Sequence, residues 1–204
     1  MKDLVVLVPD KNAQHAIDAL LKRTSALGIR HDVSHDSFVH PERDPGCLRH
    51  SHDFLRPLRK KYARALVLFD RWGCGMDNEN VSAIQSIVEQ NLSSNGWEPE
   101  VSGVVVFDPE LEAWVFNDSP HVDRALGWAG REPTLRAWLR DRGLMETGAK
   151  PTDPKRAVEE ALKFVNKPRS SAIYADLASK AGVSTCSDSS FAKFCRLLRE
   201  WFKP

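Results

Sequence analysis

Short apolar runs that alternate with amphipathic segments place the strongest constraint on how this chain can fold. Residues 4–8, 65–69 and 104–107 are unbroken runs of Val, Leu, Ala and Phe, and each is followed at once by Pro or Asp. Such runs are typical of strands that are buried on both faces of a parallel sheet. Residues 31–38 alternate weakly between polar and apolar side chains and are predicted to form a further strand.

Helices are predicted between and after these strands. Residues 12–27 and 81–92 carry apolar side chains at helical spacing. Beyond residue 119 the strand pattern stops, and helices are predicted at residues 121–126, 135–142, 155–164, 173–181 and 191–202. Strands that alternate with helices form a parallel sheet with right-handed crossovers. We therefore expect an α/β domain in residues 1–118, with a four-stranded parallel sheet flanked by helices, and a helical C-terminal region in residues 119–204.

Two segments are predicted to be loops. Residues 40–47 are rich in Pro, Gly and Asp, and residues 71–77 contain Gly73 and Gly75. A helix that carries many cations is predicted to begin near residue 54, between these two loops.

The composition is that of a globular protein, because 42% of the 204 residues are hydrophobic and the net charge is only +1. These values exclude a disordered chain. No apolar run approaches the roughly 20 residues of a membrane span, and the N-terminus lacks the apolar region of a signal peptide. We therefore expect a cytoplasmic protein with no membrane partner. The four cysteines form no CxxC pair, so the sequence indicates neither a zinc ribbon nor a redox dithiol.

Acidic residues directly follow three of the predicted strands. Asp10 follows the first strand, Asp70 follows the third, and the fourth is followed by Asp108, Glu110 and Glu112. Because parallel strands end at one edge of a sheet, these carboxylates are expected to converge where α/β sheets bind ligands. Converging carboxylates repel one another unless a cation lies among them, and Mg²⁺ or Mn²⁺ suits such oxygen ligands. The alternative is that each acid caps a helix or forms a turn.

The small net charge conceals an uneven distribution. Residues 150–204 hold 11 basic and 6 acidic residues, a net of +5, whereas residues 1–149 hold 18 and 22, a net of −4. Metal-assisted phosphoester binding would use such a division, with acids holding the cation and bases holding the phosphates. We expect Lys11, Arg71 and Lys155 to bind phosphate.

Other residues offer a polyanion-binding face or a base-stacking position. The densest basic run consists of Arg49, Arg56, Arg59, Lys60, Lys61 and Arg64, which could hold a polyanion or form a solvated helix face. Trp72 lies beside Asp70 and could stack on a nucleic-acid base, whereas Trp114, Trp128 and Trp138 are expected to be core or domain-joint anchors.

Two histidines are candidates for acid/base chemistry. His40 and His52 flank the loop that contains Cys47, and imidazole both titrates near neutral pH and binds metals. Zinc could be held by Cys47, His50 and His52, although this spacing is not that of a familiar zinc motif. Solvated or helix-capping roles are the remaining alternative.

Several short motifs resemble those of Toprim domains, which occur in topoisomerases, primases and overcoming-lysogeny-defect type nucleases. Residues 8–12 contain an acid after the first strand, residues 68–71 contain the third-strand aspartate, and residues 110–114 form an acidic stretch that runs into a tryptophan. Together with residues 150–155 and 170–174, these motifs are similar to small Toprim-like proteins of bacterial defence loci, in particular a component of the methylation-associated defence system.

The resemblance implies a Toprim-like fold in which acids bind Mg²⁺ and act on phosphodiesters. Asp10 would be a metal ligand or an acid/base residue, Asp70 the principal ligand, and Glu112 with Glu110 or Asp108 would complete the set. The chain departs from the family pattern in two places. Asp10 and Lys11 stand where Toprim proteins usually have Glu and Gly, with Gln14 at the position of a frequent second acid, and the third-strand Asp-x-Asp pattern is absent.

The resemblance therefore predicts a metal-dependent, phosphodiester-cleaving, nuclease-like component of a bacterial antiphage defence system. Its expected partners are nucleic acid and other subunits of that system. A non-catalytic subunit that binds nucleic acid, nucleotide or partner proteins is the alternative, and an enzyme that acts on a small phosphorylated molecule is a third interpretation.

Overall fold

The strands form one four-stranded sheet in the computed structural model, which describes residues 1–116, 119–148, 150–180, 182–183, 186 and 188–204. The strands are β1 (Lys2–Val8), β2 (His35–Val39), β3 (Tyr62–Asp70) and β4 (Ser102–Phe107), in the order β2-β1-β3-β4. All three neighbouring pairs are parallel. The expected α/β class with a four-stranded parallel sheet is therefore confirmed.

Each central strand is buried on both faces. Alternate residues of a strand point to opposite sides, so Leu4, Val6 and Val8 lie in one hydrophobic cluster while Val5 and Leu7 lie in the other. All five side chains are fully buried. This two-sided burial explains why β1 is an unbroken apolar run rather than an alternating one.

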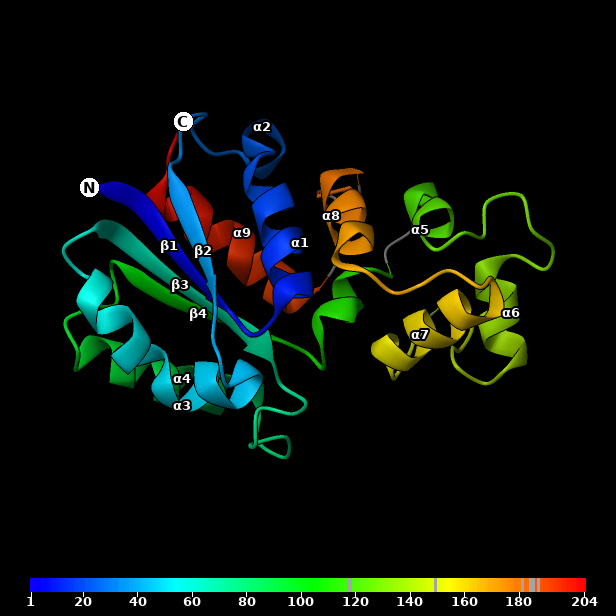
Figure 1. Cartoon of the computed structure of the whole chain (residues 1–204), viewed down its shortest axis with the longest axis horizontal. Helices are drawn as coiled ribbons and strands as arrows, with labels where there is room; N and C mark the ends of the chain where they lie inside the picture. The colour runs from blue at the N-terminus through cyan, green and yellow to red at the C-terminus, as the bar shows by residue number, and fades with distance from the viewer. Residues whose placement is uncertain (117–118, 149, 181, 184–185, 187) are drawn as a thin grey trace.

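Helices cover both faces of the sheet (Figure 1). In the N-terminal part these are α1 (Lys11–Leu21), α2 (Thr24–Leu27), α3 (Arg43–Leu55), the 3₁₀ turn η1 (Arg56–Leu58), α4 (Val81–Ser93) and the 3₁₀ turn η2 (Leu111–Trp114). Leu55 of α3 and Val88 of α4 belong to one hydrophobic cluster, and Ile17 of α1 belongs to the other. The layers are therefore α3 and α4, the sheet, and α1.

The C-terminal segment is helical, as expected. It contains α5 (Pro120–Ala125), α6 (Leu135–Asp141), α7 (Pro154–Phe164), α8 (Ser171–Lys180) and α9 (Ser189–Trp201). Figure 1 shows α5, α6 and α7 to one side of the sheet, whereas α8 packs along α1 and α9 returns to lie against β4. The division into two domains stays a prediction, and its boundary residue 118 lies outside the described residues.

Two local predictions were wrong. The predicted loop at residues 40–47 becomes helix from Arg43, because Pro45 lies in the first turn, where a helix needs no N–H donor. The helix predicted near residue 54 is instead the end of α3 followed by η1, and β3 already begins at Tyr62.

None of the helices in the described part of the chain combines the length and the apolar character that crossing a membrane requires.

The start of α3 depends on a close contact between a glycine and a histidine. His40 is 4% exposed, and its Nδ1 accepts a hydrogen bond from the Glu42 N–H at 3.1 Å. A Cβ at Gly46 would lie 2.0 Å from that same Nδ1. Only glycine therefore lets the imidazole pack against the first turn of the helix.

We predict that Gly46→Ala destabilises the fold by about 1–3 kcal/mol, because the added methyl group displaces the His40 ring. Chemical denaturation measures this change. The control is the double variant His40→Ala with Gly46→Ala, in which the two effects should be less than additive since the clash is gone. Full additivity of the two destabilisations would contradict the proposed contact.

Candidate functional site

The C-terminal ends of β1 and β3 place two aspartates at the same edge of the sheet. Asp10 caps α1 by accepting a hydrogen bond from the Ala13 N–H at 2.8 Å. Asp70, the last residue of β3, accepts one from the Leu111 N–H at 2.8 Å. Asp10 therefore caps a helix, which is the role that the alternative interpretation gave to these acids. Asp70 instead joins the C-terminal end of β3 to the segment that follows β4.

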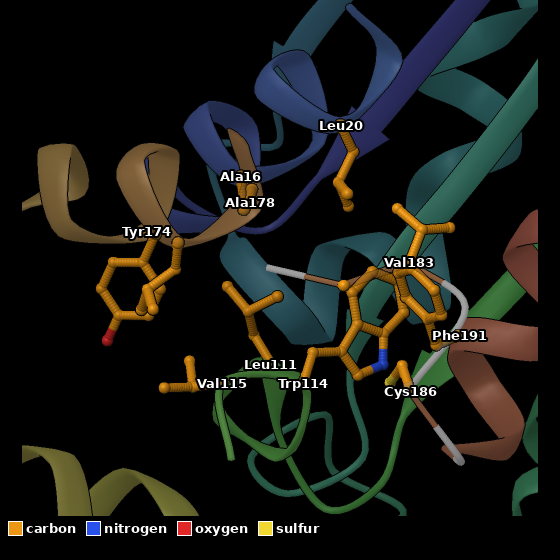
Figure 2. Close-up of a pocket in the computed structure, with 12 residues that line it drawn as sticks. Ala16, Leu20, Leu111, Trp114, Val115, Tyr174, Ala178, Val183, Cys186 and Phe191 are labelled. Atoms are coloured by element: carbon orange, nitrogen blue, oxygen red, sulfur yellow. The ribbon is translucent and has the colours of Figure 1, made fainter. Parts of the chain in front are cut away.

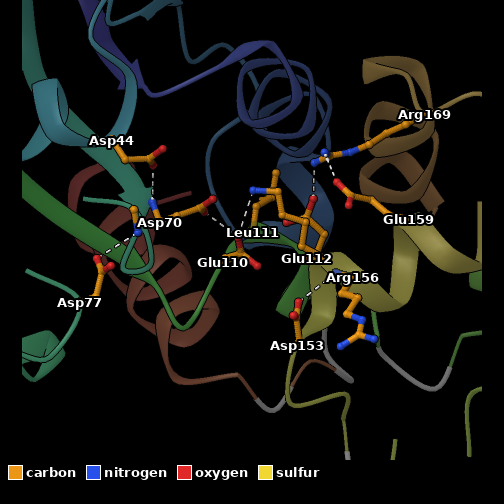
Figure 3. A network of polar contacts seen from close by, with 12 residues as sticks. Asp44, Asp70, Asp77, Glu110, Leu111, Glu112, Asp153, Arg156, Glu159 and Arg169 are labelled. Atoms are coloured by element: carbon orange, nitrogen blue, oxygen red, sulfur yellow. Dashed lines mark hydrogen bonds and ion pairs between the residues drawn. The ribbon is translucent and has the colours of Figure 1, made fainter. Parts of the chain in front are cut away.

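Asp44 joins this edge from α3. Its Oδ1 accepts a hydrogen bond from the Asp70 N–H at 2.8 Å, so the carboxyl of one acid lies against the backbone of another (Figure 3). Burial raises the pKa of Asp70 well above its usual value, and the charges of Asp44 and Glu112 add to that effect. Burial also raises the pKa of Asp44. Burial and mutual repulsion thus disfavour the charged forms of these carboxyl groups.

Glu110 has a cationic partner. It is 6% exposed, and its Oε1 lies 3.0 Å from the Nζ of Lys155 on α7. Burial raises the pKa of Glu110, although the hydrogen bond and charge of Lys155 oppose the rise. For Lys155, burial lowers the pKa, but the hydrogen bond and charge of Glu110 outweigh it and the net shift is upward. The pair is therefore an ion pair that links η2 to α7.

Glu112 is the most enclosed acid of the group, at 2% exposure. Its Oε1 accepts hydrogen bonds from the Arg169 guanidinium at 2.6 Å and from the Tyr174 hydroxyl. Arg169 also contacts the Oε1 of Glu159 at 2.8 Å (Figure 3). Burial, and then the charge of Glu112, raise the pKa of Tyr174 above its usual value, so this phenol is a hydrogen-bond donor.

These groups surround one small pocket at the edge of the sheet. Its polar lining includes Asp10, Asp70, Glu112, Lys155 and Arg169. The structure therefore brings together three predicted acids and one predicted phosphate-binding lysine, and it adds an arginine that the sequence did not single out.

Three other predicted residues lie apart from this pocket. Asp108 has a side chain that is 46% exposed, and it accepts a hydrogen bond from Arg71 Nε at 2.7 Å. Arg71 also donates to the Asp77 carbonyl at 2.7 Å. Lys11 is exposed and donates to the Gln14 side chain. Asp108 and Arg71 hold a surface loop, and the pocket lining includes neither of them nor Lys11.

The histidines serve the packing of α3. His40 is buried with its ring 5.5 Å from that of Phe54, and burial lowers its pKa. His52 Nε2 lies 3.4 Å from Asp53, and its buried Nδ1 has no hydrogen-bond partner in the part of the chain that the structure describes. Neither ring lines the acidic pocket.

No group of three or more His, Cys, Asp or Glu side chains within the described ranges is arranged to hold a metal ion. This includes the zinc alternative with Cys47, since His50 points to Glu42 with 3.8 Å between the charged atoms. The acids that face the pocket are instead held by hydrogen-bond donors and by two cations.

Figure 2 shows an apolar pocket. It adjoins the charged pocket through a shared lining residue, Leu111. Side chains of α1, η2, α8 and the start of α9, with Val183 and Cys186, surround a cavity of about 50 Å³. Leu111 lines both pockets, and the ring of Tyr174 borders the apolar one while its hydroxyl reaches Glu112. The two pockets therefore share a wall.

Sequence reasoning missed Asp44, Arg169 and Tyr174. Asp44 lay in the segment that was predicted to be a loop, so its position beneath β3 had no signal. Tyr174 lies within residues 170–174, one of the segments in which a resemblance was noted from the sequence, and Arg169 directly precedes that segment. That segment was a signal for Tyr174, whereas no local signal in the sequence indicated the contacts of Arg169.

Comparison of the chain with models of known protein families, with curated proteins and with solved structures gives no match.

We predict that Arg169→Met destabilises the fold by about 1–3 kcal/mol, because the buried Glu112 carboxylate loses its counter-charge. Adding Glu112→Gln should recover much of that loss, since the amide has no charge to compensate. Urea denaturation of the single and double variants tests this. Arg156→Met, which removes an exposed arginine of α7, is the control and should change stability by less than about 0.5 kcal/mol. An equal loss in both arginine variants would contradict the assigned ion pair.

Proposed function

We propose that this protein is a nuclease-like component of a bacterial antiphage defence system that cleaves nucleic-acid phosphodiesters with Mg²⁺ or Mn²⁺ at the edge of its sheet. The observation that carries the proposal is Asp70. It lies at the end of a central strand among Asp44, Glu110 and Glu112, and among the described side chains no lysine or arginine forms an ion pair with it. The assignment to defence rests on the Toprim-like motifs alone.

The donor chemistry of the pocket fits a hard divalent cation. Asp10, Asp70 and Glu112 line the pocket, and Asp44 and Glu110 lie close to Asp70. Among the described side chains, the cations that form ion pairs with these acids are Lys155 and Arg169. Burial raises the pKa of Asp70, the charges of Asp44 and Glu112 add to that rise, and a divalent ion would relieve the repulsion between these carboxyl groups. Asp70 and Glu112, with Asp10 and Glu110, are the residues of this chain that would hold the ion.

A bound divalent ion would lower the pKa of a water molecule and stabilise negative charge on the phosphate. The basic residues of the chain would bind the substrate. Lys155 and Arg169 each extend from the C-terminal helical region to a carboxylate, and both side chains are partly exposed. They are long enough to turn from that carboxylate to a phosphate oxygen, so the same two cations that balance the acids would hold the polyanion.

A second candidate function is supported by the ion pairs themselves. Glu110 and Glu112 already have cationic partners, and the described residues contain no ready three-ligand group. A non-catalytic subunit that binds nucleic acid, nucleotide or partner proteins would keep such a compensated edge. Metal binding distinguishes the two functions.

We predict cleavage of DNA or RNA in Mg²⁺ or Mn²⁺ that is abolished by EDTA and reduced at least about a hundredfold by Asp70→Asn or by Glu112→Gln. Both amides keep an oxygen that can accept the hydrogen bonds of the native carboxylate, so both variants should fold. Circular dichroism checks that they do. Asp141→Asn, at an exposed position of α6, is the matched control and should cleave like the wild type. Cleavage that survives in both site variants would contradict the assignment.

We predict that millimolar Mn²⁺ raises the melting temperature of the wild type and of Asp141→Asn, because an ion bound only by the folded state stabilises it. Asp70→Asn should show little or no rise. Differential scanning fluorimetry measures all three proteins. An unchanged wild-type melting temperature would favour the non-catalytic function, and an equal rise in all three would place the ion elsewhere.

A further inference from the structure

Trp72 is exposed on a loop that is otherwise tightly held. Trp72 is 38% exposed, and it lies in residues 71–77, the loop that follows β3. Its backbone N–H donates to the Pro109 carbonyl at 3.1 Å. Within the loop, Asp77 accepts hydrogen bonds from the Gly73 N–H and from Arg71. The position of Trp72 is therefore fixed on both sides.

The loop packs into the hydrophobic core through Cys74, which is much smaller than Trp72. Cys74 is fully buried in the hydrophobic cluster beneath β3, and Met76 packs against the same cluster. Burial of a tryptophan would remove far more apolar surface from water than burial of a cysteine. The arrangement leaves the largest side chain of the loop outside, so core packing does not explain Trp72.

An unpaired cation lies against the same loop. Arg49 of α3 is exposed, and its side chain forms no ion pair or side-chain hydrogen bond with the described residues. Its guanidinium is 2.7 Å from the point where a Cβ would stand at Gly75, which has a φ of +94°. The glycine thus allows the arginine to lie directly on the loop backbone.

The loop is connected to the acidic edge by three successive hydrogen bonds. The Arg71 N–H donates to the Phe107 carbonyl at 2.9 Å, the Trp72 N–H to the Pro109 carbonyl, and the Asp70 carboxylate accepts from the Leu111 N–H. Pro109 directly precedes Glu110. The segments that follow β3 and β4 therefore hold the loop of Trp72 next to the acidic edge.

We propose that Trp72 and Arg49 form a binding platform for unpaired nucleic acid, in which the indole stacks on a base and the guanidinium holds a neighbouring phosphate. This rests on the proposed function of the acidic edge and names its substrate as a single strand. Sites that bind single-stranded nucleic acid combine aromatic side chains with cations, because the face of every unpaired base can stack on an aromatic ring. The bases of a duplex are already stacked on one another.

The exposed apolar residues favour this partner over a protein. Among the described residues the large exposed ones are Met1, Trp72, Ile87 and Phe164, and they come from four different segments. Protein interfaces need a contiguous apolar patch at their centre, whereas the loop of Trp72 has a cation, Arg49, against it at Gly75.

The test is binding in EDTA, where no metal-dependent cleavage occurs. Fluorescence anisotropy would compare a labelled single-stranded DNA, a single-stranded RNA, an abasic oligonucleotide of the same length and a duplex. The wild type should bind the two base-bearing single strands more tightly than the abasic strand or the duplex. Trp72→Ala should weaken binding of those single strands by about fivefold to a hundredfold and leave abasic binding unchanged. Trp72→Phe, which keeps an aromatic face, should retain most of the affinity.

Arg49→Gln should weaken the binding of base-bearing and abasic strands alike and reduce the salt dependence by about one counterion. Arg140→Gln, at an exposed position of α6, is the control and should change neither. The platform would be overturned if the wild type bound abasic and base-bearing strands with equal affinity. It would also be overturned if Trp72→Ala bound the base-bearing strands as tightly as the wild type.

The two proposals fail separately. Base-dependent binding in EDTA without any cleavage in Mn²⁺ would overturn the cleavage function and support the platform. Cleavage of single strands that is unaffected by Trp72→Ala would overturn the platform and leave the cleavage function standing.

Discussion

The hydrogen bond from the Leu111 N–H to the Asp70 carboxylate is the interaction on which the rest of the site depends. It joins the C-terminal end of β3 to the segment that follows β4, and it fixes the backbone of Leu111, which lies between Glu110 and Glu112 in the sequence. The two glutamates can then reach different partners, Lys155 on one side and Arg169 with Tyr174 on the other. The same pair of strand exits holds the loop of Trp72, so one junction positions both the charged pocket and the proposed stacking surface.

The balance of charge at this junction explains how the sheet and the helical region are connected. A buried carboxylate is costly unless a cation or several hydrogen-bond donors compensate it. Glu110 and Glu112 obtain their cations from residues 155 and 169, which follow in the chain by more than 40 positions. Some of the excess basic residues in 150–204 therefore form ion pairs with some of the excess acidic residues in 1–149. Asp44 and Asp70 remain without a cationic partner among the described side chains, and this imbalance is what a divalent ion would remove.

The sequence predicted the sheet well and the site only in part. An unbroken apolar run such as residues 4–8 indicates two-sided burial directly, so the parallel strands and their acidic ends followed from local pattern alone. The contacts of Arg169 depend on how α7 and α8 pack, and no local pattern encodes that packing. Asp44 was missed for a related reason: the first turn of α3 contains Pro45 and Gly46, residues that usually indicate a loop, and the close fit of His40 against Gly46 overrides that tendency. Asp108 was placed in the cluster because it follows a strand, but the nearby Arg71 engages it.

The most direct test of a cation site at this edge is the broadening of backbone amide signals by substoichiometric Mn²⁺, since a paramagnetic ion relaxes only the nuclei close to it. A cation held at this edge should cause selective loss of the signals of residues 10–13, 70–72 and 110–113 in the wild type, and these signals should recover in Asp70→Asn. Uniform weak broadening, or loss centred on His50 and His52 instead, would contradict it.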